Sequence, residues 1–313
     1  MTMEWRGVMP AITTCFNDSG EIDHEFTARH VKWLVENGCS GIVTNGSLGE
    51  GGTLTIDEKQ ALWRTCVDAL GGHTPVVAAI ASMTTADACA QAVIAESAGC
   101  SGLMVLPPYV YQGDQRGIKQ HISRIAGATS LSCMLYNNPV AYGIDLLPEQ
   151  VAELAAELPN LHAVKESSTD VRRITAIRAL TGDRLAIFVG VDDAIVEGIN
   201  AGAVGWIAGL VNAFPAESVD LFDYARTASP DRARELYEWF LPLLRLDTLP
   251  KLVQLIKLAQ ERVGWGNTRV RPPRLELMGA ELEEATRLID HAIATRPVNT
   301  SRMVMNVVEW PAQ

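Results

Sequence analysis

The chain contains eight short apolar runs, each followed by a segment with the amphipathic spacing of a helix. The runs are almost continuously apolar, which is typical of parallel strands that are covered on both faces. Glycines stand where the helices would end, as helix C-caps favour. Eight such strand–helix units predict a (β/α)8 TIM barrel. The strands are expected at residues 8–13, 41–45, 76–81, 102–107, 131–136, 161–165, 185–190 and 204–209, and the helices at 25–37, 57–70, 85–98, 115–127, 148–157, 170–180, 192–201 and 216–227.

An open, doubly wound sheet is the alternative architecture for the same alternation. It is disfavoured because the segment after the first strand, TTCFNDSGEID, lacks the Gly-x-Gly-x-x-Gly turn of dinucleotide-binding folds. After residue 228 the strand pattern stops and three further helical segments follow. We therefore predict a catalytic barrel domain over residues 1–228 and a C-terminal helical appendage over residues 229–313, with helices at 230–246, 249–263 and 279–294.

The charge balance narrows the possible partners. A net charge of −11 and an isoelectric point near 5.1 argue against nucleic acid and against an anionic membrane surface. No apolar run approaches the length that spans a membrane, and the first ten residues carry no cationic lead before an apolar stretch. The six cysteines form no Cys-x-x-Cys pair, and the six histidines show no metal-ligand spacing. We therefore expect a cytoplasmic protein with reduced thiols and no bound metal.

One lysine is placed differently from the others. The chain has six lysines, and five of them fall in segments that read as helices, where a long cationic side chain can reach water. Lys165 instead ends the strand predicted at 161–165. A lysine inside a barrel mouth loses solvation, its pKa falls, and its neutral amine can form a Schiff base with a carbonyl or imine. The alternative is an ammonium group that extends to solvent or pairs with Glu166.

Tyr136 ends the strand that precedes the one carrying Lys165. Adjacent parallel strands lie roughly 4.8 Å apart, so its phenol can approach the lysine amine. A Schiff-base reaction needs a group that moves protons to the carbinolamine and to the substrate carbon, which a phenol can do. The alternative is a tyrosine that covers the rim of the barrel, while Asn137, Asn138 and Pro139 form a turn.

The loop after the second strand, GSLGEGGT at residues 46–53, has four glycines and two hydroxyl side chains. Its backbone N–H groups and the Ser47 hydroxyl can hold a carboxylate or a phosphate, whereas the alternative is a tight turn from strand to helix. Glu50 is expected to face backbone N–H groups or the protein interior rather than an anion. Asp192 and Asp193, after the seventh strand, are expected to cap the next helix.

Three motifs stand in register along the chain. They are G-S-L-G-E at 46–50 followed by T-L-T, Y-N-N-P at 136–139, and the strand lysine in H-A-V-K-E at 162–166. Together they resemble the dihydrodipicolinate synthase/N-acetylneuraminate lyase family, with matching order and spacing from about residue 5 to about residue 295. Members of that family have a (β/α)8 barrel with three C-terminal helices. Members are usually homotetramers, so the resemblance also implies a homo-oligomer, either a tetramer or a dimer.

The resemblance implies roles for seven residues. Lys165 matches the Schiff-base lysine, and Tyr136 matches the proton-shuttling tyrosine. Ser47 matches the first hydroxyl residue of the loop that holds the substrate's α-keto carboxylate, and we expect it to take part in catalysis. No metal, nicotinamide or pyridoxal phosphate is expected, because the Schiff-base lysine itself is the electron sink. The substrate-binding residues are expected to include Gly46, Leu48, Gly190 and Ile207.

Three positions depart from the family pattern. Leu48 stands where most members have threonine, which removes one hydroxyl donor. Tyr109 aligns with the first of the synthase's paired tyrosines, but Val110 replaces the second, which completes a proton relay in the neighbouring subunit's site. Ala141 replaces the arginine that binds the second carboxylate of aspartate semialdehyde. These differences argue against lysine biosynthesis and favour a smaller or less hydroxyl-rich substrate.

The combination of G-S-L-G-E, Y-N-N-P-x-A-Y-G and G-W-I-A-G-L-V-N-A-F-P resembles the 1-pyrroline-4-hydroxy-2-carboxylate deaminases of hydroxyproline breakdown. That resemblance implies a Schiff-base lyase or hydrolase that converts this small 2-imino acid to 2-oxoglutarate semialdehyde and ammonia. Two alternatives that act on 2-keto acids are a 2-keto-3-deoxy sugar acid aldolase and a dihydrodipicolinate synthase-like enzyme. An alternative of another class is a non-catalytic barrel that binds a small carboxylate.

Overall fold

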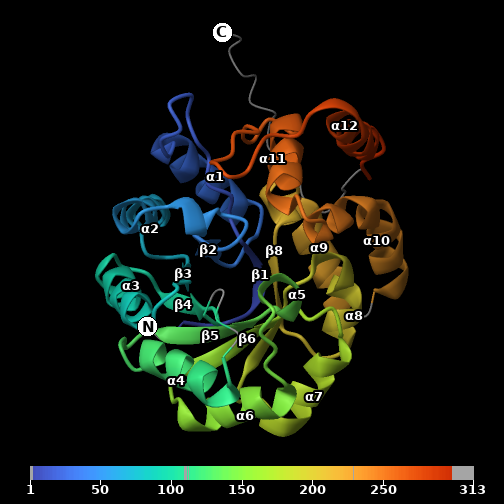
Figure 1. Cartoon of the computed structure of the whole chain (residues 1–313). Coiled ribbons are helices and arrows are strands. Elements are labelled where there is room, and N and C mark those ends of the chain that lie inside the picture. Colours follow the sequence, from blue (N-terminus) through green and yellow to red (C-terminus); the bar gives the residue numbers. More distant parts are fainter. Residues whose placement is uncertain (1–2, 109–110, 112, 228, 298–313) are drawn as a thin grey trace.

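A parallel barrel forms the body of the molecule in the computed structural model, which describes residues 3–108, 111, 113–227 and 229–297. Within these residues, eight strands pair in the order β1-β8-β7-β6-β5-β4-β3-β2. A parallel bridge between Ala11 and Val43 brings the two ends of this order together. The predicted (β/α)8 barrel is therefore confirmed (Figure 1). The strands are β1 (Gly7–Pro10), β2 (Ile42–Thr44), β3 (Val76–Ile80), β4 (Gly102–Val105), β5 (Ser132–Asn137), β6 (Leu161–Glu166), β7 (Ala186–Val189) and β8 (Gly205–Ala208).

Helices surround the strands on the outside of the barrel (Figure 1). The segment predicted as one helix at 192–201 is instead a 3-10 turn, Asp192–Ala194, followed by a short α-helix. An additional helix of four residues, α5, lies where the sequence predicts a turn after the fifth strand. The helices of the barrel are α1 (His24–Glu36), α2 (Ile56–Leu70), α3 (Thr85–Ser97), α4 (Gln115–Ala126), α5 (Pro139–Tyr142), α6 (Pro148–Glu157), α7 (Arg172–Thr181), α8 (Ile195–Asn200) and α9 (Pro215–Arg226).

Three further helices follow the barrel, as predicted: α10 (Pro230–Leu244), α11 (Leu252–Arg262) and α12 (Gly279–Ala294). A 3-10 turn, Arg245–Thr248, joins α10 to α11. The boundary between two domains at residues 228 and 229 remains a prediction, and residues 298–313 of the predicted appendage lie outside the described part of the chain. None of the described helices is long and apolar enough to cross a membrane.

Capping chemistry sets where several helices begin. The Thr55 hydroxyl accepts a hydrogen bond from the Glu58 N–H, and the Glu58 carboxylate accepts one from the Thr55 N–H, which forms a capping box at the start of α2. The Thr84 and Asp114 side chains cap α3 and α4 in the same acceptor role. Each of these caps directly follows the loop that leaves a strand, so the helix starts are held near the carboxyl ends of the strands.

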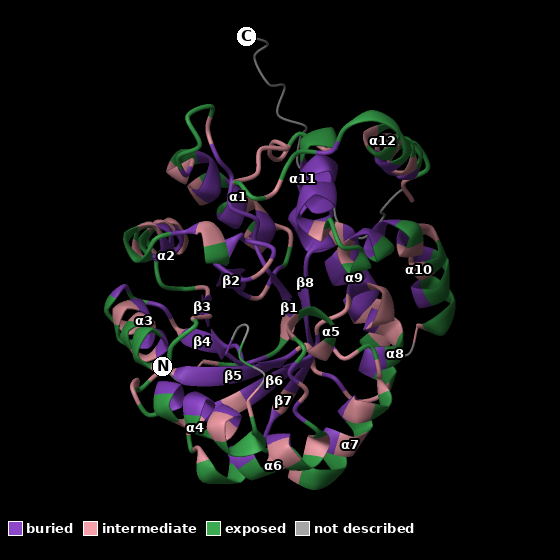
Figure 2. Ribbon diagram, viewed as in Figure 1, coloured by how far each residue is buried: buried purple, intermediate pink, exposed green. Residues whose placement is uncertain are grey.

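Burial divides the molecule into a buried sheet and partly exposed helices (Figure 2). Every residue of β3 and β5 is buried, which explains why these strands read as continuous apolar runs. Before β1, the Trp5 ring meets Phe188 of β7 edge to face with centroids 6.2 Å apart, and Trp5 Nε1 donates to Ser132 Oγ, at the start of β5, at 2.7 Å. In barrels of this kind the carboxyl ends of the strands form the face for a site.

Candidate active site

Lys165 and Tyr136 are register partners on the neighbouring strands β6 and β5. The Lys165 Nζ lies 4.3 Å from the centroid of the Tyr136 ring. Lys165 is 6 % exposed and Tyr136 is 5 % exposed. The amine therefore does not extend to bulk solvent, and the phenol does not merely cover the barrel rim. The structure brings together the two residues that the sequence singles out.

Glu166 does not neutralise Lys165. Its carboxylate accepts hydrogen bonds from Asn137 Nδ2 at 3.1 Å and from the Ser168 N–H at 2.6 Å. Successive residues of a strand point to opposite faces, so Glu166 lies on the other side of β6 from the lysine. The pairing of Lys165 with its sequence neighbour, the alternative left open by the sequence, is therefore absent.

The environment of Lys165 makes its amine easier to deprotonate than that of an exposed lysine. Burial lowers the pKa of Lys165 to about 8, although the charges of Asp247 and Asp192 oppose this change by stabilising the ammonium form. Burial raises the pKa of Tyr136 to about 12, against a hydrogen bond from Asn138 that favours the phenolate. At neutral pH the phenol thus carries a proton while part of the lysine population is ready to act as a nucleophile.

Asp192 is buried and takes part in the polar network at the end of β8 rather than in a helix cap. The residue before α8 is Ala194, which makes no side-chain cap, and Asp193 Oδ2 lies 3.6 Å from Arg245 Nε. The prediction that these two aspartates cap the next helix is therefore wrong. Burial raises the pKa of Asp192 to about 6, and its hydrogen bonds oppose that rise. The donors to its carboxylate are Leu210 N at 2.9 Å, Gly209 N at 3.1 Å and Trp206 Nε1 at 3.2 Å.

Tyr142 contacts both the Ser47 side chain and the ring of Tyr136. The Ser47 and Tyr142 hydroxyl groups are hydrogen bonded. The rings of Tyr142 and Tyr136 meet edge to face, with centroids 5.8 Å apart and an interplanar angle of 83°. Tyr142 is not among the predicted site residues, although Asn138 followed by Pro139 is a signal for a helix start, and the Asn138 side chain does cap α5. This short helix brings a second phenol to the site.

The glycine-rich loop after β2 is a tight turn. The Gly51 N–H donates to the Gly46 carbonyl at 3.1 Å, and the Glu50 N–H donates to the Ser47 carbonyl at 3.2 Å. Glu50 has a left-handed backbone, with φ of 53°, and a Cβ on Gly51 would overlap the Asn45 carbonyl oxygen. The turn is thus confirmed, while the binding of a carboxylate by this loop remains a prediction.

Glu50 is fully buried and paired with a lysine from α11. Its Oε1 lies 2.6 Å from Lys257 Nζ, and its Oε2 accepts a hydrogen bond from the Arg271 N–H at 3.0 Å. The expectation that Glu50 faces the interior and a backbone N–H is confirmed. The expectation that all five helical lysines reach water is wrong, because Lys257 is 1 % exposed and Lys59 is 7 % exposed. Burial lowers the pKa of both lysines.

The remaining predicted site residues are Gly190, Gly46, Leu48 and Ile207. A Cβ on Gly190 would fall 2.6 Å from Lys165 Cε, so the absence of a side chain there leaves room for the lysine stem. Gly46 belongs to the loop after β2, and Leu48 is buried in the same loop. Ile207 is buried in β8, which β7 separates from β6. Among the positions that depart from the family pattern, Ala141 lies in α5, whereas Tyr109 and Val110 lie outside the described residues.

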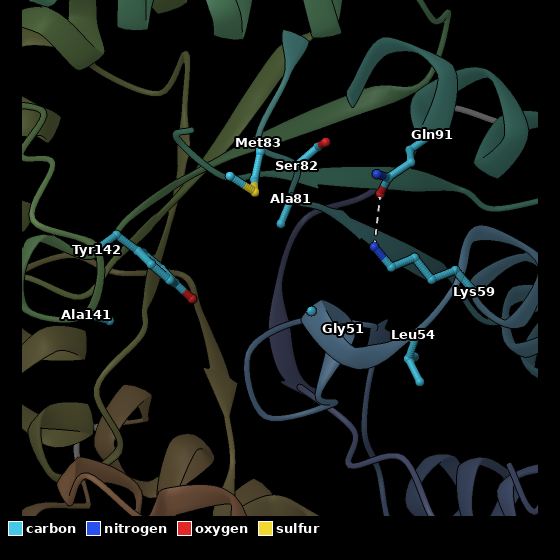
Figure 3. A pocket seen from close by; sticks show the side chains of 10 residues that line it. Gly51, Leu54, Lys59, Ala81, Ser82, Met83, Gln91, Ala141 and Tyr142 are labelled. Carbon is cyan, nitrogen blue, oxygen red and sulfur yellow. Dashed lines mark hydrogen bonds between the residues drawn. The ribbon is translucent and has the colours of Figure 1, made fainter. Parts of the chain in front are cut away.

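A pocket of about 530 Å³ borders this arrangement (Figure 3). Tyr142 and Ala141 form one wall, and Lys59, whose Nζ donates to Gln91 Oε1 at 3.3 Å, lies on the opposite wall. Lys165 and Tyr136 do not line it, whereas Tyr142, whose ring meets that of Tyr136, does. In the described part of the chain, no group of three or more His, Cys, Asp or Glu residues is placed to hold a metal ion.

Comparison with known proteins identifies the family that this chain resembles along nearly its whole length. The model of the dihydrodipicolinate synthetase family matches residues 4–292. A 4-hydroxy-tetrahydrodipicolinate synthase of Chelativorans sp. is 32 % identical over 289 residues, covering 92 % of this chain and 98 % of the relative. The corresponding enzyme of Desulforamulus reducens is 29 % identical over 290 residues, covering 93 % of this chain and 98 % of the relative.

Solved structures of dihydrodipicolinate synthases share the fold of this chain. A dihydrodipicolinate synthase from Bacillus anthracis superposes with a TM-score of 0.89 at 27 % identity, covering 92 % of this chain and 99 % of that chain. The 4-hydroxy-tetrahydrodipicolinate synthase of Methylacidiphilum fumariolicum has a TM-score of 0.88 at 27 % identity, covering 93 % of this chain and 98 % of that chain. With the fold, the motifs and nearly the whole length in agreement, the chain belongs to the dihydrodipicolinate synthetase family.

Proposed function

We propose that this protein is a deaminase that converts 1-pyrroline-4-hydroxy-2-carboxylate to 2-oxoglutarate semialdehyde and ammonia through a Schiff base on Lys165. Membership in the family makes the chain an enzyme, a lyase of the class I aldolase type, so the alternative of a non-catalytic barrel is set aside. The observation that carries the proposal is the buried Lys165 amine, 4.3 Å from the ring centroid of Tyr136 and with a lowered pKa.

In the first step, the neutral amine of Lys165 attacks C2 of the cyclic imine. The bond between C2 and the ring nitrogen then breaks, which opens the ring and leaves a primary amine on C5. The departing nitrogen needs a proton, and the Tyr136 phenol, which is protonated at neutral pH because of its raised pKa, supplies it. A side chain at position 190 would overlap the lysine stem, so Gly190 allows Lys165 to take this position.

The following steps remove water and ammonia. Loss of a proton from C3 gives an enamine, and the enamine expels the 4-hydroxyl group as water. Tautomerisation turns the C5 amine into an imine, which water hydrolyses to the aldehyde and ammonia. A second water hydrolyses the Schiff base and frees Lys165. One water is released and two are consumed, so the net reaction takes up one water.

The loop after β2 and the helix α5 position the substrate. In the proposal, Ser47 holds the substrate carboxylate, and the Tyr142 hydroxyl, bonded to Ser47, extends a path for protons toward Tyr136. The neutral side chain of Ala141 at the edge of the bordering pocket suits a substrate with a single carboxylate. Lys165 acts as electron sink, so the proposal includes no cofactor. We also propose that the protein is a homo-oligomer, as a dimer or a tetramer, and that it acts in the cytoplasm.

A second candidate is 4-hydroxy-tetrahydrodipicolinate synthase, because the curated relatives described above carry that name. The same lysine and phenol would serve that reaction, since a 2-keto acid also forms a Schiff base. The synthase substrate brings a second carboxylate. Ala141, which replaces the arginine expected for that group, supplies no charge for it.

A parallel assay of substrates tests the proposal. Ammonia release from 1-pyrroline-4-hydroxy-2-carboxylate is measured beside aldehyde release from 2-keto-3-deoxygluconate and condensation of pyruvate with aspartate semialdehyde. We expect ammonia release to exceed the other two activities by about 100-fold in kcat/KM, which corresponds to roughly 3 kcal/mol of transition-state discrimination. Aldehyde release or condensation without ammonia release would replace the proposal with the aldolase or the synthase.

The chemistry at Lys165 has its own test. Borohydride reduction in the presence of the substrate should attach it to Lys165, as located by peptide mass spectrometry. In Lys165→Ala we expect the adduct and the turnover to vanish while the fold remains. Lys59→Ala is the matched control, because Lys59 is also buried and also has a lowered pKa. Turnover by Lys165→Ala, or an adduct located on Lys59, would contradict the mechanism.

A further inference from the structure

Asp247 is a carboxyl group that the C-terminal helices bring to the mouth of the barrel. It lies in the 3-10 turn Arg245–Thr248, between α10 and α11, which Figure 1 shows on the side of the barrel near β8 and α9. A Cβ placed on Gly209 would lie 2.8 Å from the Asp247 Cγ and 3.1 Å from the Leu48 Cδ2. The Asp247 carboxyl group therefore rests on the backbone that follows β8, where the loop after β2 also arrives.

Asp247, Asp192 and Lys165 act on one another electrostatically. Burial raises the pKa of Asp247 well above its usual value, the charge of Asp192 raises it further, and the charge of Lys165 opposes the rise. The same two carboxylates favour the ammonium form of Lys165. The Asp247 carboxyl group lies against Gly209, whose N–H donates to Asp192, so the two carboxyl groups are neighbours at the end of β8, within electrostatic range of Lys165.

Hydrogen bonding distinguishes the two carboxyl groups. Asp192 accepts hydrogen bonds from the backbone N–H groups of Gly209 and Leu210, and these donors stabilise its anion. Among the described residues, none donates a hydrogen bond to the carboxyl group of Asp247. Asp247 is half-buried, and a proton shared by the two neighbouring carboxyl groups resides on it because the hydrogen-bond donors stabilise the anion of Asp192.

We propose that Asp247 is the general acid that protonates the 4-hydroxyl group of the substrate as that group leaves. The inference rests on the proposed deaminase function and deepens it. Hydroxide is a poor leaving group, and a carboxylic acid proton converts it to water while the enamine electrons break the C4–O bond. The Tyr136 phenolate left by ring opening takes the C3 proton, and the proton released when water hydrolyses the protonated Schiff base restores the acid form of Asp247, so no external acid is consumed.

The apolar side chain of Leu48 favours the protonated form of Asp247. Its buried side chain and the Asp247 carboxyl group both lie against Gly209, and an apolar neighbour excludes water without offering a hydrogen bond to an anion. A hydroxyl residue at position 48 would place a hydrogen-bond donor in this region, and such a donor favours an ionised carboxyl group. The departure of Leu48 from the family pattern thus fits an enzyme that keeps a carboxylic acid ready for a leaving hydroxyl group.

The test compares Asp247→Asn with the unsubstituted enzyme, since asparagine has the same shape but no acidic proton. The matched control is Asp193→Asn, which removes a nearby carboxylate that lies against Arg245 instead. Three readouts are taken with 1-pyrroline-4-hydroxy-2-carboxylate: borohydride trapping on Lys165, exchange of the C3 proton in D2O, and ammonia release. We expect trapping and exchange to persist in Asp247→Asn, while ammonia release falls about 100-fold or more. Asp193→Asn should retain all three.

Each outcome decides the question. Ammonia release by Asp247→Asn at the unsubstituted rate would overturn the role, and so would a parallel loss of trapping and exchange, which would mean that Asp247 acts through Lys165. Failure of the unsubstituted enzyme to release ammonia would instead overturn the proposed function, and this role with it. A 4-chloro analogue sharpens the result, because chloride leaves without a proton. Asp247→Asn should eliminate chloride within about threefold of the unsubstituted rate.

Discussion

At the residue scale, the chemistry depends on a balance of solvation and charge around one amine. Burial of Lys165 disfavours its ammonium form, and the carboxylates of Asp192 and Asp247 favour it. Burial is the larger effect, so the pKa falls from 10.5 to about 8. A proton held by Asp247 removes one of the opposing charges and moves the balance further toward the neutral amine.

The pH dependence of the reaction follows from this balance. Only the neutral amine attacks, so kcat/KM should rise about tenfold per pH unit below pH 8 and level off above it. Asp192→Asn removes a charge that stabilises the ammonium form, and the inflection should move to lower pH. Profiles of kcat/KM measured from pH 5 to pH 10 check both expectations. An inflection near 10.5, the ordinary value of lysine, would show that Lys165 is not desolvated in solution.

At the element scale, the site is assembled by the short connections that follow the strands. The loop after β2 supplies Ser47, and α5 supplies Tyr142, while β5 and β6 supply Tyr136 and Lys165. A helix of four residues has little stability of its own, so α5 depends on its Asn138 cap and on its contacts with the loop. The hydrogen bond between Ser47 and Tyr142 connects these two elements.

A double-mutant cycle measures that connection. Ser47→Ala and Tyr142→Phe should each lower kcat by about tenfold, and the double variant should be little worse than either, because both remove the same hydrogen bond. The expected coupling is about 1 kcal/mol in transition-state free energy. Pairing Ser47→Ala with Tyr224→Phe, on α9, should give additive effects. Additivity in the Ser47 and Tyr142 pair would mean that the two hydroxyl groups act independently.

At the scale of the whole molecule, the C-terminal helices hold the catalytic face in place. Lys257 on α11 reaches Glu50 in the loop after β2. Arg271, beyond α11, pairs with Glu58 at 2.6 Å, which lowers the pKa of that carboxyl group to about 2. These contacts join the C-terminal segment to the loop and the helix that follow β2.

Breaking the buried ion pair should destabilise the protein. Lys257→Met leaves Glu50 buried without a partner and should lower the free energy of unfolding by roughly 3 to 5 kcal/mol. Adding Glu50→Gln removes the uncompensated charge and keeps an acceptor for the Arg271 N–H, so most of that loss should be recovered. Urea unfolding of the two variants and the unsubstituted protein measures the difference. An equal loss in the double variant would mean that packing, not charge, is what Lys257 supplies.

Several features of the site follow from local sequence. The eightfold alternation of apolar and amphipathic segments is a local pattern, and it is sufficient to predict the barrel and to place Lys165 and Tyr136 at strand ends. Parallel neighbours in such a barrel are in contact, so the approach of the two side chains also follows from their positions. The tight turn of the glycine-rich loop is predictable for the same reason, because the backbone conformations it needs are set by its own residues.

Other features were decided only by the tertiary structure. Lys257 and Glu50 are 207 residues apart, and their pairing shows that a lysine in an amphipathic helix need not reach water. Asp192 turns away from the helix it precedes because donors at the end of β8 lie closer to its carboxylate. Asp247 carries no local signal for catalysis. Its role, like those two, arises from burial and from partners distant in the chain, which a local pattern does not contain.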